Sequence, residues 1–411
     1  MGFLCRYLHE YGWDPYVVSC NCFGHPSKIH SHLEHDRAKV IWVDWDRKHH
    51  DTALPPRSLL KMAKRFFRPE HSDYPGLHTK TVTVADRAIR ELRPSLMIAS
   101  TSSLYPIPVA AALSAKFSIP WIADLRDIEE QWAMCDEALA WRLWLRRRRF
   151  TVRRNSLIGQ ASAVTTVADW HRQSLLRYNR RTHIICNGYD PDLFCPVNTV
   201  DDVCFRISYT GALLRREDQD PSLLFAACGR MLANGGVHRK RIAVDFYVQH
   251  AKHADLAKMA QEYGIREVVH CYDFVPIEQI PHILNRSAVL LLLSNKAEPN
   301  GPKGLTRTTK LYEYLAVQRP ILCVRSDEAE LEQFMGSICA GCCARTIEEA
   351  IAFLQVAYAE WSSTGTVRFH GDAEKVRQFS RREQAGQFAE LCDTVVGTNG
   401  VSPLNSRNIW E

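Results

Sequence analysis

A short segment near position 310 combines residue types that bind an anion. It runs from Gly304 to Ala316 and is typical of a loop that opens a helix. Thr308 and Thr309 can cap the free N–H groups of this helix, and Lys310 adds a full charge to the partial positive charge of the helix dipole. A phosphate is therefore expected to bind here without a metal.

Glu313 extends this segment from phosphate to sugar recognition. It follows Lys310 by three positions and therefore lies on the same face of the helix. A carboxylate at this place can accept hydrogen bonds from the diol of a ribose. Phosphate and ribose together indicate a nucleotide.

Two arginines after another predicted strand have the right chemistry for a diphosphate. The strand 205–210 ends in Gly211, which lets a ligand approach the backbone closely, and Arg215 and Arg216 follow. A guanidinium donates two parallel hydrogen bonds, which suits a diphosphate. We favour Arg215 as a catalytic contact and assign Arg216 to donor binding. For one of the two, a solvated surface position is an equally good interpretation.

Acidic residues follow an apolar strand in the first half of the chain. Asp124, Arg126 and Asp127 lie at this strand end, where α/β folds place their ligand contacts. Carboxylates suit sugar hydroxyls, so Asp124 and Asp127 are candidate catalytic residues that orient an acceptor. The alternative is an internal Asp–Arg pair that holds the loop together, and we prefer it for Arg126.

Two other groups of residues contain metal ligands. Asp44 and Asp46 follow an apolar run, and such a pair can hold a divalent cation that bridges a diphosphate. The second group consists of Cys20, Cys22, His25, His30, His32 and His35. Its spacing fits no regular zinc module. We prefer exposed acids for the first group and a strand that runs into a polar loop for the second, so no metal site is expected.

The composition is that of a globular protein. The chain has 411 residues, of which 46% are hydrophobic, enough for two or three domains. The apolar runs are far shorter than the roughly 20 residues that span a bilayer. The N-terminus lacks the features of a signal peptide, so a cytoplasmic location is expected.

The 14 cysteines are scattered along the chain. Without an export signal, free thiols are expected rather than disulfides. Cys339, Cys342 and Cys343 are predicted to be small core residues that precede a helix starting near Thr346.

The net charge of +6 is unevenly spread. Residues 141–154 hold seven arginines, three aromatic residues and no acids. Such a helix can lie on anionic lipid head groups, where each cation contributes about 1 kcal/mol. This interpretation places the protein at the inner face of a membrane. A solvated helix is an equally good interpretation, and nucleic acid is not an expected partner.

Predicted helices and strands alternate along the chain, which indicates parallel sheets covered by helices. Pro191, Pro196 and the polar segment 198–202 interrupt the alternation. We therefore predict an α/β fold with two doubly wound, Rossmann-like domains, over residues 1–198 and 203–375, that face a cleft.

Several spaced blocks of the sequence resemble family 4 glycosyltransferases, which have the GT-B fold. The most specific block reads Lys-Leu-Tyr-Glu-Tyr-Leu-Ala from Lys310, with Arg-Pro-Ile-Leu from Arg319. The other blocks are 121–127, 163–167, 187–190, 207–211, 220–222 and 274–293. The resemblance covers most of the chain from Met1 to about Val395.

The resemblance implies a nucleotide-sugar donor and a glycan or lipid-linked acceptor, with retention of configuration. Lys310, Arg215 and the helix terminus would stabilise the departing diphosphate. In the family this phosphate is thought to help deprotonate the acceptor, so no protein nucleophile, metal or other cofactor is required.

The resemblance also assigns donor-binding residues and a domain crossing. Asn187 and Gly188, which predict a turn, would face the donor, as would Val275. A final helix within 376–395 would return to the first domain.

The sequence departs from the family pattern in two places. Many members have a glutamate eight positions before the residue that matches Glu313, whereas this chain has Leu305. The family also begins with a strand and a glycine-rich loop, whereas this chain is predicted to begin in the helix after them, through truncation or the lack of a strand. Two alternatives to a transferase therefore stay open: a noncatalytic nucleotide-sugar or glycan-binding homologue, and an NDP-sugar epimerase.

Overall fold

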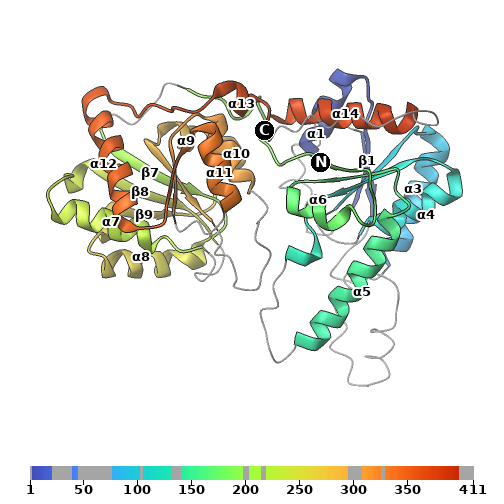
Figure 1. Ribbon diagram of the computed structural model, residues 1–411, viewed down its shortest axis with the longest axis horizontal. Helices are drawn as coiled ribbons and strands as arrows, with labels where there is room; N and C mark the ends of the chain where they lie inside the picture. The colour runs from blue at the N-terminus through green and yellow to red at the C-terminus, as the bar shows by residue number, and fades with distance from the viewer. Residues whose placement is uncertain are drawn as a thin grey trace. The chain divides into compact units, whose positions relative to one another are not determined.

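The protein consists of two compact units. The computed structural model describes residues 2–20, 39–44, 76–101, 105–131, 140–197, 203–213, 219–294, 308–324 and 329–397 (Figure 1). Unit 1 extends from Met1 to Cys186 and resumes at Gln384, and unit 2 extends from Asn187 to Glu383. The chain thus completes unit 2 before its C-terminal end returns to unit 1.

Unit 1 is built on parallel strands. One sheet has the order β3-β4-β5-β6, and β1 pairs with β2 in a separate two-stranded sheet. The strands are β1 Tyr16–Cys20, β2 Lys39–Val43, β3 Met97–Thr101, β4 Trp121–Leu125, β5 Ala163–Thr166 and β6 Thr182–Ile184. The helices are α1 Gly2–Leu8, α3 Leu77–Leu92, α4 Ile107–Phe117, α5 Ala140–Ile158, α6 Asp169–Leu175 and α14 Arg381–Gly397.

Alternating side chains of β4 pack against helices on both faces of the four-stranded sheet. Trp121 and Ala123 belong to a core that includes residues of α4 and α6. Ile122 instead packs with Leu391 and Cys392 of α14. Because successive side chains of a strand point to opposite faces, unit 1 has the two helical layers of a Rossmann-like fold.

Unit 2 contains a six-stranded parallel sheet in the order β12-β11-β10-β7-β8-β9. Its strands are β7 Phe205–Thr210, β8 Ile242–Tyr247, β9 Val269–Tyr272, β10 Val289–Leu293, β11 Ile321–Val324 and β12 Gly341–Ala344. Its helices are α7 Ser222–Ala233, α8 His253–Glu262, α9 Ile280–Arg286, α10 Thr309–Ala316, α11 Ala329–Ile338, α12 Ile347–Thr364 and α13 Ala373–Arg377. β10 is apolar throughout and entirely buried, as expected for a central strand covered on both faces.

The boundary between the units differs from the predicted one at 198–203. The segment that starts at Asn187 already belongs to unit 2. The Val197 N–H donates to Asn285 Oδ1 at 2.8 Å, and Arg319 Nη2 donates to the Val197 carbonyl at 2.8 Å. Prolines mark the end of the alternating pattern, but these hydrogen bonds hold the segment on unit 2.

The cysteines near position 340 are not all in the core. Cys342 and Cys343 lie half-buried in β12, a strand that the sequence analysis does not predict. Cys339 is exposed, so its prediction as a core residue is wrong. It has a φ of 57° just after α11, where the chain turns toward the sheet edge. The cysteines in the described part of the chain form no disulfide with one another.

The N-terminal part begins as predicted within the described residues, since α1 precedes β1. Among the helices that the structure describes, none has the length and apolarity needed to cross a membrane.

Candidate functional site

The described part of the predicted anion-binding segment, from Thr308 onward, lies at the carboxyl edge of the unit 2 sheet. β7 and β10 are parallel neighbours, so their carboxyl ends meet at one edge, and α10 follows β10 in the chain. Thr308 is the N-cap of α10, and its hydroxyl accepts a hydrogen bond from the Lys310 backbone N–H at 3.2 Å. Thr309 is the exposed first residue of the helix. The predicted cap at Thr308 is therefore present.

The ammonium group of Lys310 lies at the loop that follows β7. Its Nζ donates to the Tyr209 hydroxyl at 2.5 Å and to the Ala212 carbonyl at 3.2 Å. The Tyr209 hydroxyl donates in turn to the Ala212 carbonyl at 2.8 Å. Burial raises the pKa of Tyr209, so its hydroxyl stays neutral. Neutral groups thus hold the cation at the strand end, where its charge can attract an anion.

Gly211 makes room for this lysine. Its φ of +102° lies in the region that favours glycine. A Cβ atom at this position would lie 2.7 Å from Cε of Lys310, which is too close for a normal contact. The structure therefore brings together two predicted residues, Gly211 and Lys310, that are far apart in the sequence.

Burial shifts the pKa values of both charged residues of α10 toward neutral pH. It lowers the pKa of Lys310 to about 8, because a buried cation is disfavoured, and Glu313 partly offsets this effect. Burial raises the pKa of Glu313 to about 7, and the positive charges of Lys310 and Arg381 partly offset it. Perturbed pKa values of this kind cluster at functional sites.

Sequence analysis missed three residues that shape this site: Tyr209, Tyr314 and Arg381. The Tyr314 hydroxyl, which is fully buried, accepts a hydrogen bond from the Thr210 N–H at 3.2 Å and so ties α10 to β7. The repeated tyrosines of Tyr-Glu-Tyr were a signal for Tyr314, since a buried hydroxyl needs a partner. No local pattern indicates that Arg381, which precedes the unit boundary, is close to Glu313.

The other predicted donor residues have different outcomes. Arg215 and Arg216 lie outside the described residues. Val275 lies half-buried in the loop after β9. Asn187 is half-buried and Gly188 is buried, but they form no turn, and Gly188 does not have a positive φ. The turn prediction is wrong because this pair lies in the connection that leaves unit 1.

Asp124 is a structural carboxylate rather than a surface group that can orient an acceptor. It has no exposed surface. Ser100 donates to its Oδ2 at 2.6 Å and Thr165 donates to its Oδ1 at 2.9 Å. Arg126 lies 3.4 Å from the same Oδ1. The catalytic assignment of Asp124 is therefore wrong, and the internal Asp–Arg pair is present. Asp127 is half-buried and stays a prediction.

The Asp124–Arg126 pair also anchors the end of unit 1. Arg126 donates to the carbonyl groups of Ile185 and Cys186, each at 3.3 Å. The guanidinium thus joins the end of β4 to the last residues before the chain enters unit 2. This arrangement holds the loop together, as the alternative interpretation predicts.

Arg154 does not contribute to a membrane-facing surface. It is buried, donates to both carboxylate oxygens of Glu130 at 2.8 and 2.7 Å, and bonds to Asn155. Its inclusion in the basic segment 141–154 as a lipid-binding cation is therefore wrong. Arg148 and Arg149 of the same helix are exposed.

The predicted metal ligands fall mostly outside the described residues. Asp44 is exposed, and its backbone carbonyl accepts a hydrogen bond from Lys80 at 2.8 Å. Asp46 lies outside the described residues. Of the cysteine–histidine group, only Cys20 at the end of β1 is described. The described residues therefore test neither group.

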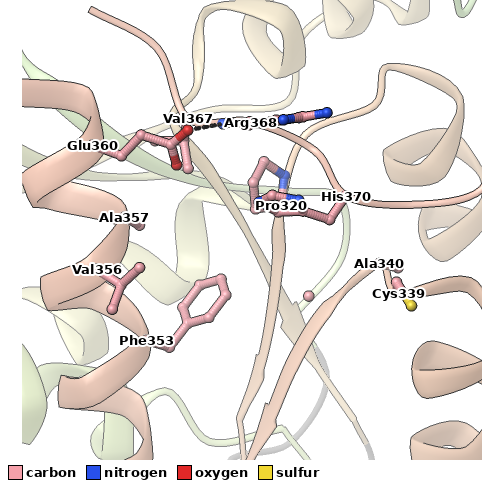
Figure 2. Close-up of a pocket in the computed structure, with 11 residues that line it drawn as sticks. Pro320, Cys339, Ala340, Phe353, Val356, Ala357, Glu360, Val367, Arg368 and His370 are labelled. Atoms are coloured by element: carbon pink, nitrogen blue, oxygen red, sulfur yellow. Dashed lines mark hydrogen bonds between the residues drawn. The ribbon is translucent and has the colours of Figure 1, made fainter. Parts of the chain in front are cut away.

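A small pocket of about 100 Å³ lies at the opposite edge of the unit 2 sheet (Figure 2). Pro320 and Gly341, at the amino ends of β11 and β12, line it together with apolar residues of α12. Its polar rim includes Glu360, whose Oε1 accepts a hydrogen bond from the Arg368 N–H at 3.2 Å. Parallel α/β sheets bind ligands at their carboxyl ends, so the α10 site is the stronger candidate.

Comparisons with known proteins agree with this arrangement. Residues 3–188 match the model of the glycosyl transferase 4-like domain. Sucrose-phosphate synthase from Thermosynechococcus elongatus has a similar structure, with a TM-score of 0.64, 15% identity, and coverage of 96% of this chain and 92% of that chain. No curated protein sequence matches the chain at a significant level.

Two further solved structures share the fold over nearly their whole length. A glycosyltransferase from Rickettsia africae has a TM-score of 0.61 at 10% identity, with coverage of 96% of this chain and 94% of that chain. The Anabaena protein HepE, in complex with UDP and glucose, has a TM-score of 0.60 at 13% identity, with coverage of 96% of each chain. The chain thus has the GT-B fold of these solved structures, with two Rossmann-like domains, and its residues 3–188 resemble a family 4-like glycosyltransferase domain.

Proposed function

We propose that the protein transfers a sugar from a nucleotide-sugar donor to a glycan or lipid-linked acceptor. The observation that carries the proposal is the position of Lys310 against Gly211, at the N-terminus of α10. A diphosphate at this place would meet the ammonium group, the free N–H groups of the helix and its dipole. Glu313, on the same helix, would accept hydrogen bonds from the ribose.

The proposed reaction is metal-independent and retains the configuration at the sugar. The bond between the anomeric carbon and the phosphate oxygen breaks, and a bond to the acceptor oxygen forms on the same face. The proton of the acceptor hydroxyl passes to the departing diphosphate. Lys310 and the α10 N-terminus would stabilise the negative charge that develops on this leaving group, together with Arg215.

A uridine diphosphate sugar is the first donor to test. The Anabaena protein HepE has been solved in complexes with UDP and with UDP-glucose. This likeness supports the choice of a nucleotide, whereas the shape of the sugar pocket decides the sugar. Val275, with Asn187 and Gly188, is assigned to the donor side in this proposal.

The experiment uses purified protein and a panel of labelled nucleotide sugars, with UDP, GDP and ADP donors. Release of nucleotide together with hydrolysis or transfer of the sugar is the expected result. Binding without turnover would favour the noncatalytic homologue, and isomerisation of the sugar would favour the epimerase. If no nucleotide sugar binds, the assignment of the donor site is wrong.

We also propose that α5 makes peripheral contact with an anionic membrane, at its cytoplasmic face. The exposed side chains of Arg148 and Arg149 support this contact, since each cation near such a surface contributes about 1 kcal/mol. Cosedimentation with vesicles that contain phosphatidylserine should decrease at least fivefold for the double variant Arg148→Glu/Arg149→Glu. Vesicles of phosphatidylcholine are the control, and equal binding to both would contradict the proposal.

A further inference from the structure

Three side chains with metal-ligand atoms converge where β8 and β9 end. His250 and His253 follow β8, and Asp273 follows β9 directly. One ligand atom from each residue lies within 4.8 Å of the others. We infer that these three residues bind a divalent transition metal ion, of the class to which zinc belongs.

The backbone brings the three side chains together. β8 and β9 are parallel neighbours, so the residues after them share one edge of the sheet. His250 opens a 3₁₀ turn (His250–Lys252) that leads directly into α8. The spacing of three residues places both imidazoles on one side of this turn, with ring centroids 4.8 Å apart.

The distances suit a tetrahedral ion. His250 Nδ1 lies 3.1 Å and His253 Nε2 lies 3.5 Å from Oδ1 of Asp273. Bonds from zinc to nitrogen and oxygen are about 2.0–2.2 Å long, so two ligand atoms of a tetrahedral site lie about 3.3 Å apart. The two observed distances bracket this value. The side chain of His250 is 83% exposed and can rotate to adjust the distance between the nitrogens.

An unsatisfied nitrogen favours a metal over a simple ion pair. Nε2 of His253 is buried and has no hydrogen-bond partner among the described residues. Buried polar atoms in folded proteins are nearly always partnered. The hydrogen bond between His250 and Asp273, at 3.1 Å, leaves the His253 nitrogen without a hydrogen bond, whereas a metal ion would use all three groups.

The ligand set defines the class of ion. Two imidazole nitrogens and one carboxylate suit zinc, cobalt or nickel, whereas magnesium and calcium prefer oxygen ligands alone. Three protein ligands leave one position for water. The site shares no residue with the α10 site, so it does not change the metal-independent reaction proposed above.

A metal at this place would hold a turn that also supports the loop beyond Gly211. Gln249, which precedes His250, donates to the Leu213 carbonyl at 2.6 Å and accepts from the Leu213 N–H at 3.0 Å. The metal would therefore fix the start of α8 next to this double hydrogen bond. Its expected effect is on stability.

The test measures zinc bound to the full chain after removal of metal by a chelator. The chain holds 14 cysteines and 17 histidines, which are potential zinc ligands elsewhere, so the readout is the difference between variants. Wild-type protein should bind one equivalent more than His250→Ala or Asp273→Asn. The affinity of this site should fall about 100-fold in each variant, because loss of even an outer-shell partner costs about 10–100-fold.

Thermal unfolding gives a second readout that does not depend on activity. Zinc should raise the melting temperature of the wild type, since a ligand that binds the folded state stabilises it. The rise should vanish in both variants and persist in His270→Ala, which removes an exposed histidine of β9. Equal zinc binding and an equal rise in all four proteins, or no rise in any, would overturn the inference.

Discussion

Asp124 of unit 1 and Glu313 of unit 2 both lie near the carboxyl edge of a parallel sheet, but their surroundings differ. Asp124 is fully buried, and side chains of β3, β5 and the β4 loop saturate its oxygens. Glu313 is only partly buried, its pKa is raised to about 7, and it shares its helix with a lysine of lowered pKa. A carboxylate thus stabilises the fold in unit 1, whereas the surroundings of the carboxylate in unit 2 favour ligand binding.

The completeness of their hydrogen bonds distinguishes the two carboxylates. A carboxylate whose hydrogen bonds are complete stabilises its own fold and has little capacity left for a ligand. Burial instead shifts the pKa values of Lys310 and Glu313 toward neutral pH, and a bound ligand of suitable charge can stabilise their charged forms. Substitutions in the two units should separate these two roles.

Removal of the buried carboxylate should have the largest effect on stability. Asp124→Ala leaves Arg126, Ser100 and Thr165 without their shared acceptor, so the free energy of unfolding should fall by about 3–5 kcal/mol. Denaturant unfolding measures this change, with the exposed Asp14→Ala as the control. Nucleotide affinity of the folded variant should stay the same. A loss of less than 1 kcal/mol would mean that Asp124 is not a structural centre.

Removal of the α10 cation should weaken nucleotide binding and change stability little, the reverse of the result expected for Asp124→Ala. Lys310→Ala removes charge-assisted hydrogen bonds to the diphosphate, each worth about 1.5–3 kcal/mol, so UDP affinity should fall roughly 10–100-fold. Glu313→Ala should also weaken binding, and unfolding should change little in either variant. Calorimetric titration with UDP measures the effect, and Lys258→Ala on α8 is the control. Unchanged affinity in both variants would place the nucleotide elsewhere.

Because Gly211 and Lys310 are in contact, Gly211→Ala should have smaller effects on both stability and UDP affinity. Gly211→Ala adds a Cβ that would lie 2.7 Å from the lysine at a φ of +102°. Gly235 is a matched control, because it has a φ of +68° and no neighbour within 4 Å of an added Cβ. Backbone strain should cost each variant about 1–2 kcal/mol. Only Gly211→Ala should also weaken UDP binding, and equal affinities in the two variants would contradict the contact.

The pKa values predict a modest pH dependence of nucleotide affinity. In the protein without bound nucleotide, Lys310 loses its proton above about pH 8. Binding of the diphosphate must then protonate this lysine again, so affinity falls as pH rises. Below about pH 7 Glu313 becomes protonated and accepts hydrogen bonds less well, so affinity falls as pH decreases. Titrations with UDP should therefore show a maximum between about pH 7 and 8. The high-pH decrease should disappear in Lys310→Met and the low-pH decrease in Glu313→Gln.

Much of the fold follows from local patterns. The strand Phe205–Thr210 is found where its sequence predicts it. β12 is missed because Gly341–Ala344 is short and lacks β-branched residues, and its place at the sheet edge depends on pairing with β11. The unit boundary was misplaced for a similar reason, since Asn285 and Arg319 hold Val197 from distant parts of the chain.

The candidate site was predictable only in part. The cap at Thr308 and the shared face of Lys310 and Glu313 are local properties of one helix. The structural roles of Asp124 and Arg154 could not be predicted, because their partners come from other strands and loops. His253 and Asp273 show the same limit, since neither position indicates a ligand until β8 and β9 are paired.

Local sequence patterns were sufficient to predict the alternation of elements, the helix that begins after Thr308, and the resemblance to family 4 glycosyltransferases. These properties depend on residues a few positions apart, where spacing alone sets geometry. The three-dimensional fold was needed to show which charged side chains have complete hydrogen bonds and which lie where they can bind a ligand. The burial and the pKa of a side chain depend on neighbours that the order of the strands brings together, and no short segment of the sequence determines this order.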